Sequence, residues 1–201
     1  MKITILDRTL LLITGLLAAY QVAFGLDGRP TAVIIAYTIT FGVLLVAGLL
    51  LIILGFEILD APAVVVVSTL IPLSLATGLV WEHLTSFRTL YLLFAILGFL
   101  AISVTRLIPI QGKLPTILLA IVHGIAGMTI FLLPIILSLS GQATLGFALV
   151  GVGGALIGVG GLLLAFLKSG KPILSQKLIL TVLPGLLLLM TISFVAGFKY
   201  G

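Results

Sequence analysis

His123 is the residue whose type and position could do chemistry within an apolar segment of this sequence. It lies nine residues into the apolar stretch 114–139, about 13 Å from the start of that stretch if the stretch is a helix. Gly124 and Gly127 lie close to it and leave one side of the helix nearly free of side chains. A flat tetrapyrrole needs a nitrogen ligand and small neighbours that let its ring lie close, and this pattern provides both.

A second interpretation of the same residues stays open. Small residues also let a neighbouring helix approach, and the imidazole could donate a hydrogen bond to that helix. The other histidine, His83, is expected near the opposite side of the membrane, so the two would not ligate one haem. The pattern therefore predicts either a contact between helices or at most one singly ligated tetrapyrrole, held at His123, Gly124 and Gly127.

The residue types that hydrolysis requires occur together near Glu82, His83 and Ser86. Closeness in sequence does not provide a triad geometry, and no nucleophile elbow is visible, so we interpret this segment as a solvated connection. The chain has no cysteine, which excludes disulfides, thiolate metal sites and cysteine nucleophiles. Every carboxylate falls within or beside a predicted loop, whereas ion-coupled pumps usually need one at depth. These features favour a non-enzymatic role.

The segment 145–167 carries a row of glycines at helical spacing. Gly151, Gly154, Gly158 and Gly161 recur at steps of three and four, which places them on one face of a helix. Small residues at this spacing allow close contact between two helix backbones. A phosphate loop is not indicated, because the run is apolar and lacks a Lys-Ser/Thr ending. We expect this face to pack against a helix of this chain or of another subunit.

The elements that carry these residues are those of an integral membrane protein. Of the 201 residues, 62% are hydrophobic and 7% are charged, whereas a soluble domain has roughly a quarter charged residues. A span needs about 20 mostly apolar residues. Loop residues divide the chain into seven such segments, at about 9–24, 31–56, 63–80, 89–105, 114–139, 145–167 and 178–198. We therefore expect an all-α membrane fold, with residues 1–201 forming one polytopic bundle of about seven spans and short loops, or of six if the short fourth segment is re-entrant.

Positive charges set the predicted orientation. With the N-terminus inside, the inner segments hold seven of the ten lysines and arginines, and the outer segments hold Arg29, Arg88 and Lys199. Cytoplasmic loops carry such an excess, so we predict an N-inside protein of a bacterial-type plasma or internal membrane. Because topology accounts for the net charge of +5, no nucleic-acid partner is expected.

Two functions fit these observations. The first is a non-enzymatic subunit that lies in the lipid bilayer, packs with other membrane subunits or with itself, and holds a pigment, haem or lipid near His123. The alternative is a small transporter or facilitator for a neutral solute, built from two parallel three-helix repeats. It rests on similar runs at 46–51 and 159–164, which Pro72 and Pro184 follow at similar distances. A midplane cavity lined by polar side chains would favour the transporter, and a solid bundle would favour the subunit.

Overall fold

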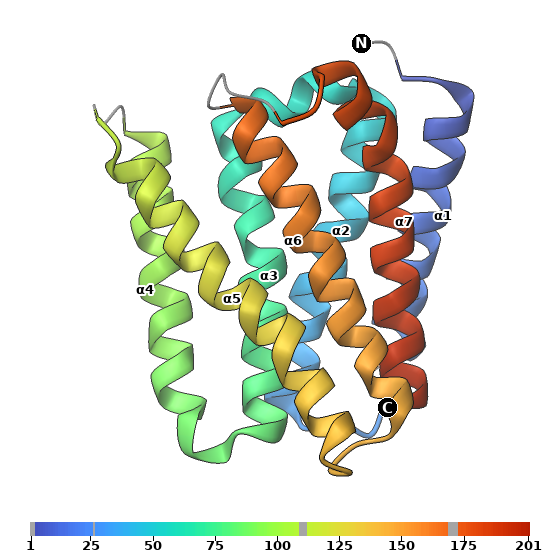
Figure 1. The fold of residues 1–201 in the computed structure, drawn as a ribbon, viewed down its shortest axis with the longest axis vertical. Coiled ribbons are helices and arrows are strands. Elements are labelled where there is room, and N and C mark those ends of the chain that lie inside the picture. The colour runs from blue at the N-terminus through green and yellow to red at the C-terminus, as the bar shows by residue number, and fades with distance from the viewer. Residues whose placement is uncertain (1–2, 26, 109–111, 169–172) are drawn as a thin grey trace.

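The computed structural model describes residues 3–25, 27–108, 112–168 and 173–201. Seven helices in these ranges are long and apolar enough to cross a membrane, which confirms a multi-spanning all-α fold. They run in alternate directions, so the two ends of the chain define an N-terminal side and a C-terminal side of the bundle (Figure 1). The fourth predicted segment forms a helix of 20 residues and is a full span. The helices are α1 (Ile5–Phe24), α2 (Thr31–Leu54), α3 (Pro62–His83), α4 (Arg88–Leu107), α5 (Leu114–Leu139), α6 (Ala148–Lys168) and α7 (Gln176–Tyr200).

Helix α1 begins four residues before the predicted boundary at residue 9. The Thr4 hydroxyl accepts a hydrogen bond from the Asp7 N–H at 3.2 Å, and the Asp7 carboxylate accepts one from the Thr4 N–H at 2.8 Å. This capping box satisfies backbone donors that the first turn of a helix leaves free. The predicted boundary is wrong here because hydropathy alone does not register a helix cap.

The connections between helices are short and well defined. Helix α2 ends at Gly55, whose φ of +73° lies in the left-handed region that favours glycine. A 3₁₀ helix, η1 (Phe56–Asp60), follows. Pro62 occupies the first turn of α3, where backbone N–H groups have no acceptor within the helix, so the missing N–H of proline removes no hydrogen bond. Two further 3₁₀ helices, η2 (Thr85–Phe87) and η3 (Leu145–Phe147), lead directly into α4 and α6.

Six of the helices form a ring, and α4 lies outside it. Neighbours around the ring follow the order α1, α2, α3, α5, α6 and α7, and α7 closes the ring against α1. Helix α4 packs on α3 and α5 at the edge of the bundle (Figure 1). This position explains why α4 buries few residues, namely Ala95, Gly98, Ile102 and Thr105.

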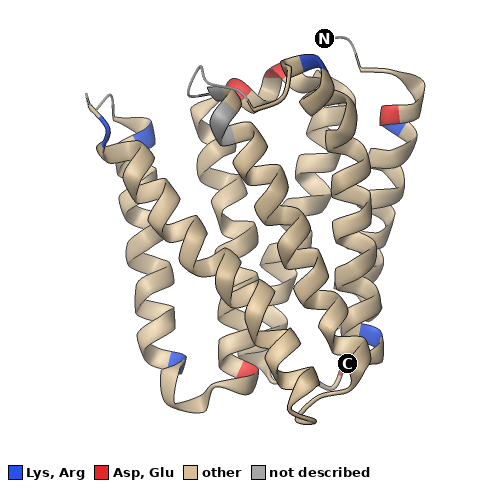
Figure 2. Cartoon of the chain, viewed as in Figure 1, with Lys and Arg blue, Asp and Glu red and all other residues tan. Residues whose placement is uncertain are grey.

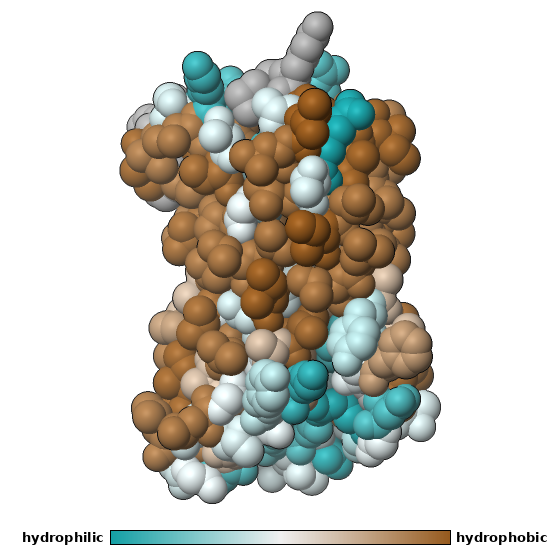
Figure 3. Space-filling view, turned by 90° about the vertical axis from the view of Figure 1, so that its right-hand side faces the viewer, coloured by the Kyte–Doolittle hydropathy of each residue, from teal (hydrophilic) through white to brown (hydrophobic). Residues whose placement is uncertain are grey.

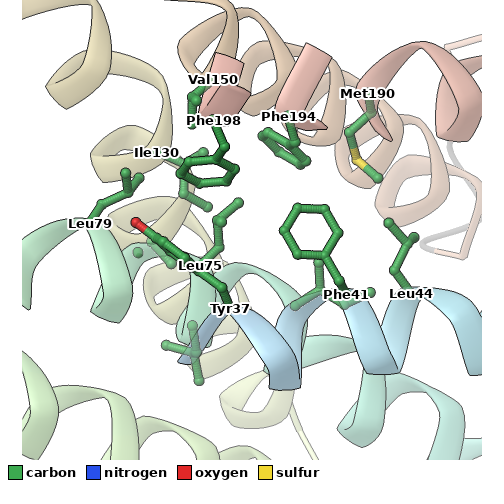
Figure 4. Close-up of a cluster of buried hydrophobic side chains, with 14 of the residues drawn as sticks. Tyr37, Phe41, Leu44, Leu75, Leu79, Ile130, Val150, Met190, Phe194 and Phe198 are labelled. Atoms are coloured by element: carbon green, nitrogen blue, oxygen red, sulfur yellow. The ribbon is translucent and has the colours of Figure 1, made fainter. Parts of the chain in front are cut away.

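Large side chains fill the interior of the ring. Tyr37 and Phe41 of α2 point toward Phe194 and Phe198 of α7 (Figure 4), and the centroids of the Tyr37 and Phe198 rings are 4.6 Å apart. Phe41 lies edge-on to both α7 rings, with centroid distances of 6.5 and 6.2 Å. Edge-to-face aromatic pairs at these distances are mutually attractive. The aromatic cluster is extended by the buried residues Leu44, Leu75, Leu79, Ile130, Val150 and Met190.

The outer surface of the bundle is a belt of apolar side chains. Hydrophobic residues cover the middle of the face drawn in Figure 3, and hydrophilic residues gather toward its two ends. The charged residues of the described ranges also lie near the two ends (Figure 2). Large side chains such as Leu97 and Leu162 are exposed, at 63% and 59%. A surface of this kind requires a lipid bilayer around it, because soluble proteins rarely expose apolar patches of this extent.

Candidate functional site

Helices α5 and α6 meet most closely in the half of the bundle near its C-terminal side. A Cβ atom on Gly154 would lie 2.8 Å from the backbone nitrogen of Phe131, and one on Gly151 would lie 2.6 Å from the Phe131 carbonyl oxygen. A side chain at either position would therefore collide with the backbone of α5. This is the close approach that small residues permit between membrane helices. These two glycines of the predicted row pack against a helix of the same chain.

The other half of the glycine row faces open space. Gly158 and Gly161 continue the row of Gly151 and Gly154 toward the N-terminal side, where α5 and α6 separate (Figure 1). Within the part of the chain that the structure describes, a Cβ atom on Gly158 or Gly161 would meet no heavy atom within 4 Å. Both residues are exposed. Helix α5 therefore covers Gly151 and Gly154 but leaves Gly158 and Gly161 of the same row uncovered.

Helix α5 carries open glycines on its matching face. Gly127 and Gly124 lie four and seven residues before Phe131, which places all three on the side of α5 that faces α6. A Cβ atom on either glycine would also find no described heavy atom within 4 Å. The diverging halves of the two helices thus carry open glycines on their facing sides. We call these four residues, Gly124, Gly127, Gly158 and Gly161, the glycine wedge.

His123 lies at the border of the glycine wedge. Around the axis of α5, Gly127 is about 40° from His123 and Gly124 about 100°, and buried Ile130 lies on the same face as His123, about 20° away in the other sense. The Nδ1 atom of His123 is buried and has no hydrogen-bond partner among the described residues. His123 lies near the Leu119 backbone but makes no well-formed hydrogen bond through Nδ1. Gly127 shares the face of the imidazole, whereas Gly124 lies about a quarter turn away. Ligation of a tetrapyrrole at His123, Gly124 and Gly127 stays a prediction.

A polar cluster that the sequence did not predict lies at the C-terminal side of the bundle. Nη1 of Arg29 donates to both carboxylate oxygens of Glu82, at 2.6 and 2.7 Å. The Tyr37 hydroxyl donates to Glu82 Oε2 at 3.3 Å, and Nη2 of Arg29 donates to the Phe198 carbonyl at 3.4 Å. The Arg29 guanidinium also lies over the rings of Tyr37 and Phe198, 5.7 and 5.3 Å from their centroids. We call Arg29, Tyr37, Glu82 and Phe198 the Arg29 cluster.

The Arg29 cluster corrects the interpretation of Glu82 and His83 as a solvated connection. Both residues belong to the last turn of α3, and the Glu82 side chain is only 23% exposed. Helix α3 continues past the end of the predicted apolar segment at residue 80 because Arg29 provides a counter-ion for Glu82. Two features of the sequence could have suggested this pair: the charges are opposite, and they flank consecutive antiparallel spans.

A pocket of about 230 Å³ lies beside the Arg29 cluster and opens at the C-terminal side. Asp27, Arg29, Glu82, His83 and Phe147 are among the residues that line it. The His83 ring packs on Phe147 with centroids 5.0 Å apart, and its Nε2 atom lies 3.9 Å from Glu82 Oε2. Both carboxylate oxygens of Glu82 accept hydrogen bonds from Arg29, and Oε2 accepts another from Tyr37. Over the described ranges, no group of three or more His, Cys, Asp or Glu side chains is placed to hold a metal ion.

Comparison of the chain with models of protein families, with curated proteins and with solved structures finds no match. The function is therefore inferred from the geometry of the molecule itself. The glycine wedge is the feature that brings together most of the residues predicted from the sequence.

Proposed function

We propose that this chain is a non-enzymatic subunit of a membrane assembly, and that a transmembrane helix of a different subunit occupies the glycine wedge. The observation that carries the proposal is the pair of open glycine rows on the facing sides of α5 and α6. Both rows continue faces that pack tightly against each other closer to the C-terminal side. The proposed interface is therefore an extension of an interface within the chain.

The composition of the wedge supports an occupant made of protein. Glycine within a helix is about 1 kcal/mol less favourable than alanine. Helix association in lipid depends on van der Waals contact between closely approaching backbones, which glycine permits. A Cβ atom on any of the four glycines would meet no described heavy atom within 4 Å, so a partner helix has room to make such contact with them.

The shape of the wedge favours a different subunit over a second copy. A two-fold dimer brings the same surface of each copy together. Because the backbones of α5 and α6 diverge (Figure 1), a single helix can lie against both glycine rows, whereas two copies of this face placed together would not bring all of their glycines into contact. Lipid chains alone would fill the wedge without selecting for glycine on both sides.

The packed interior also supports a subunit over a facilitator. The ring order, with α4 outside and α1–α3 parallel to α5–α7, does agree with two three-helix repeats joined by a linker helix. Phe41 and Phe194, however, are fully buried along the axis that a solute would have to follow. Transport along this axis would require the aromatic cluster to move aside.

Replacement of Gly158 and Gly161 by leucine tests the proposal. The double variant Gly158→Leu/Gly161→Leu should lose co-purifying membrane protein in mild detergent while its own thermal unfolding stays unchanged, because leucine has room within this chain. The matched control is Gly42→Leu in α2, where a Cβ atom also has no described neighbour within 4 Å. The control should retain the partner.

Three outcomes would overturn this proposal. One is a wild-type particle that is strictly monomeric and free of other proteins. Another is a particle that contains only copies of this chain, which would make the wedge a homodimer surface. The third is full retention of the partner by the double variant.

A further inference from the structure

Three of the four buried side-chain atoms that lack a hydrogen-bond partner of good geometry in the described part of the chain belong to α4 and α5: Tyr91 Oη, Arg106 Nε and His123 Nδ1. Tyr91 lies in the first turn of α4 and Arg106 in its last turn, so the two residues do not share one site. Tyr91 and His123 also lie near polar groups of α5, the Thr129 hydroxyl and the Leu119 backbone, so Arg106 is the member without a neighbouring partner. Natural proteins rarely leave buried polar groups unsatisfied, so such a group indicates a bound molecule, ion or water. The glycine wedge lies between α5 and α6, and Arg106 belongs to α4, so this is a separate feature.

Arg106 is the charged member of this group. It lies in the last turn of α4, at the N-terminal side of the bundle, and its side chain is partly buried. Side chains of a helix lean toward the helix N-terminus, so the Arg106 side chain leans back along α4 and not beyond its end. The ion pairs of the described ranges all involve Glu82, at the opposite side, so no carboxylate of these ranges neutralises Arg106.

A second cation lies at the same end of the helix pair. Lys113 is the N-cap residue of α5, is exposed, and has no ion pair in the described ranges. Figure 2 shows basic residues at this end of α4 and α5, set apart from the rest of the bundle. Two positive charges without carboxylates therefore lie where the polar surface of the bilayer meets its apolar core.

The side chains below these cations are apolar and face lipid. Val104 and Leu107 of α4 are 49% and 61% exposed, and Ile117 and Ile121 of α5 are 50% and 51% exposed. A molecule bound here would meet positive charge at the membrane surface and hydrocarbon below it. That combination fits a phospholipid.

We propose that Arg106 and Lys113 bind the phosphate of an anionic phospholipid whose acyl chains lie along α4 and α5. A guanidinium presents several donors that match the oxygens of a phosphate, and Lys113 adds a second charge without a fixed geometry. An anionic lipid is favoured over a zwitterionic one, because the ammonium group of phosphatidylcholine or phosphatidylethanolamine would lie near two cations. Polybasic sites at membrane surfaces select anionic lipids by the same electrostatics.

The test measures thermal unfolding of the purified full chain in a neutral detergent with added lipid. Phosphatidylglycerol should raise Tm more than phosphatidylcholine does, and the difference should shrink as salt screens the charges. Arg106→Gln and Lys113→Gln should each lose most of this difference. Lys113 is exposed, so its variant keeps the experiment informative even if Arg106→Gln does not fold.

The control variant removes a charge from the opposite side of the bundle. Lys199→Gln changes an exposed lysine near the C-terminus and should retain the full preference for phosphatidylglycerol. In a separate measurement, inorganic phosphate is added in place of lipid. It should leave Tm unchanged, because it lacks the acyl chains. Equal effects of the two lipids, an undiminished preference in both Gln variants, or the same shift with inorganic phosphate alone would each overturn the lipid site.

Discussion

Arg29 and Glu82 lie 53 positions apart in the sequence and form an ion pair in which Nη1 contacts both carboxylate oxygens at 2.6 and 2.7 Å. The pair joins the start of α2 to the end of α3, and its further contacts reach Tyr37 within α2 and Phe198 of α7. Both side chains are largely shielded, with 19% and 23% exposure. The Arg29 cluster therefore fixes three helices of the ring to one another at the C-terminal side.

Replacement of either partner should destabilise the bundle. Arg29→Gln leaves the Glu82 charge without its counter-ion, and Glu82→Gln does the same to Arg29, so we expect each to cost about 2 kcal/mol. The measurement is unfolding in detergent by increasing denaturant. Lys199→Gln should have little effect, because Lys199 is exposed and has no ion pair in the described ranges.

The double variant Arg29→Gln/Glu82→Gln separates pairing from other effects. Because the first substitution already breaks the contact, the second should cost much less than it does alone. Losses that add fully in the double variant would mean that the two residues act independently.

The two halves of the glycine row should respond differently to a large side chain. Gly154→Leu places its Cβ 2.8 Å from the backbone of Phe131, so α5 and α6 must move apart, at a cost of about 1–3 kcal/mol or more. Gly158→Leu meets open space and should leave the stability of the isolated chain unchanged. Thermal unfolding of both purified variants checks this difference. Equal destabilisation would show that α5 and α6 are as close at Gly158 as they are at Gly154.

The number of spans and the shared helix face of the glycine row could be predicted because both depend on local sequence. Runs of apolar residues define spans, and steps of three and four residues define a helix face. What the glycines contact depends on the crossing of α5 and α6, which no local pattern records. Gly154 and Gly158 are similar in sequence terms, yet one is tightly packed and the other is open.

The Arg29 cluster was missed for a similar reason. Its members come from α2, α3 and α7 and from the segment before α2, and only the folded ring brings them together. Helix ends were also predicted less well than helix interiors. Cap hydrogen bonds fix the start of α1, and an ion pair stabilises the last turn of α3. Neither interaction contributes to hydropathy, so a prediction from apolar runs places both helix ends inaccurately.

The orientation of the bundle can be tested with introduced cysteines, because the chain has none of its own. The excess of positive charge predicts that positions near Lys113 are labelled from the cytoplasm. Positions near Asp27 and Gln142 should be labelled from the opposite side of the membrane. The loop at Lys171, which is also predicted to be inside, lies outside the described residues. The reverse pattern of labelling would contradict the N-inside orientation, and labelling of Lys113 and Asp27 from one side would contradict the alternating spans.

His123→Leu tests whether the imidazole binds anything. If His123 ligates a tetrapyrrole, the purified wild-type protein should absorb visible light, and the variant should lose that absorption while its apolar bundle survives. If His123 instead donates a hydrogen bond to a helix of another subunit, no absorption is expected, and the variant should lose about 1 kcal/mol of stability within the assembly.

The control for His123→Leu is Met128→Leu, a similar change at a half-exposed position of α5 that keeps the imidazole. It should alter neither the absorption spectrum nor the stability. A protein without visible absorption whose stability is unchanged or raised in His123→Leu would reject both interpretations. In that case the unpartnered Nδ1 atom would be a buried polar group that only costs free energy, and leucine would remove that cost.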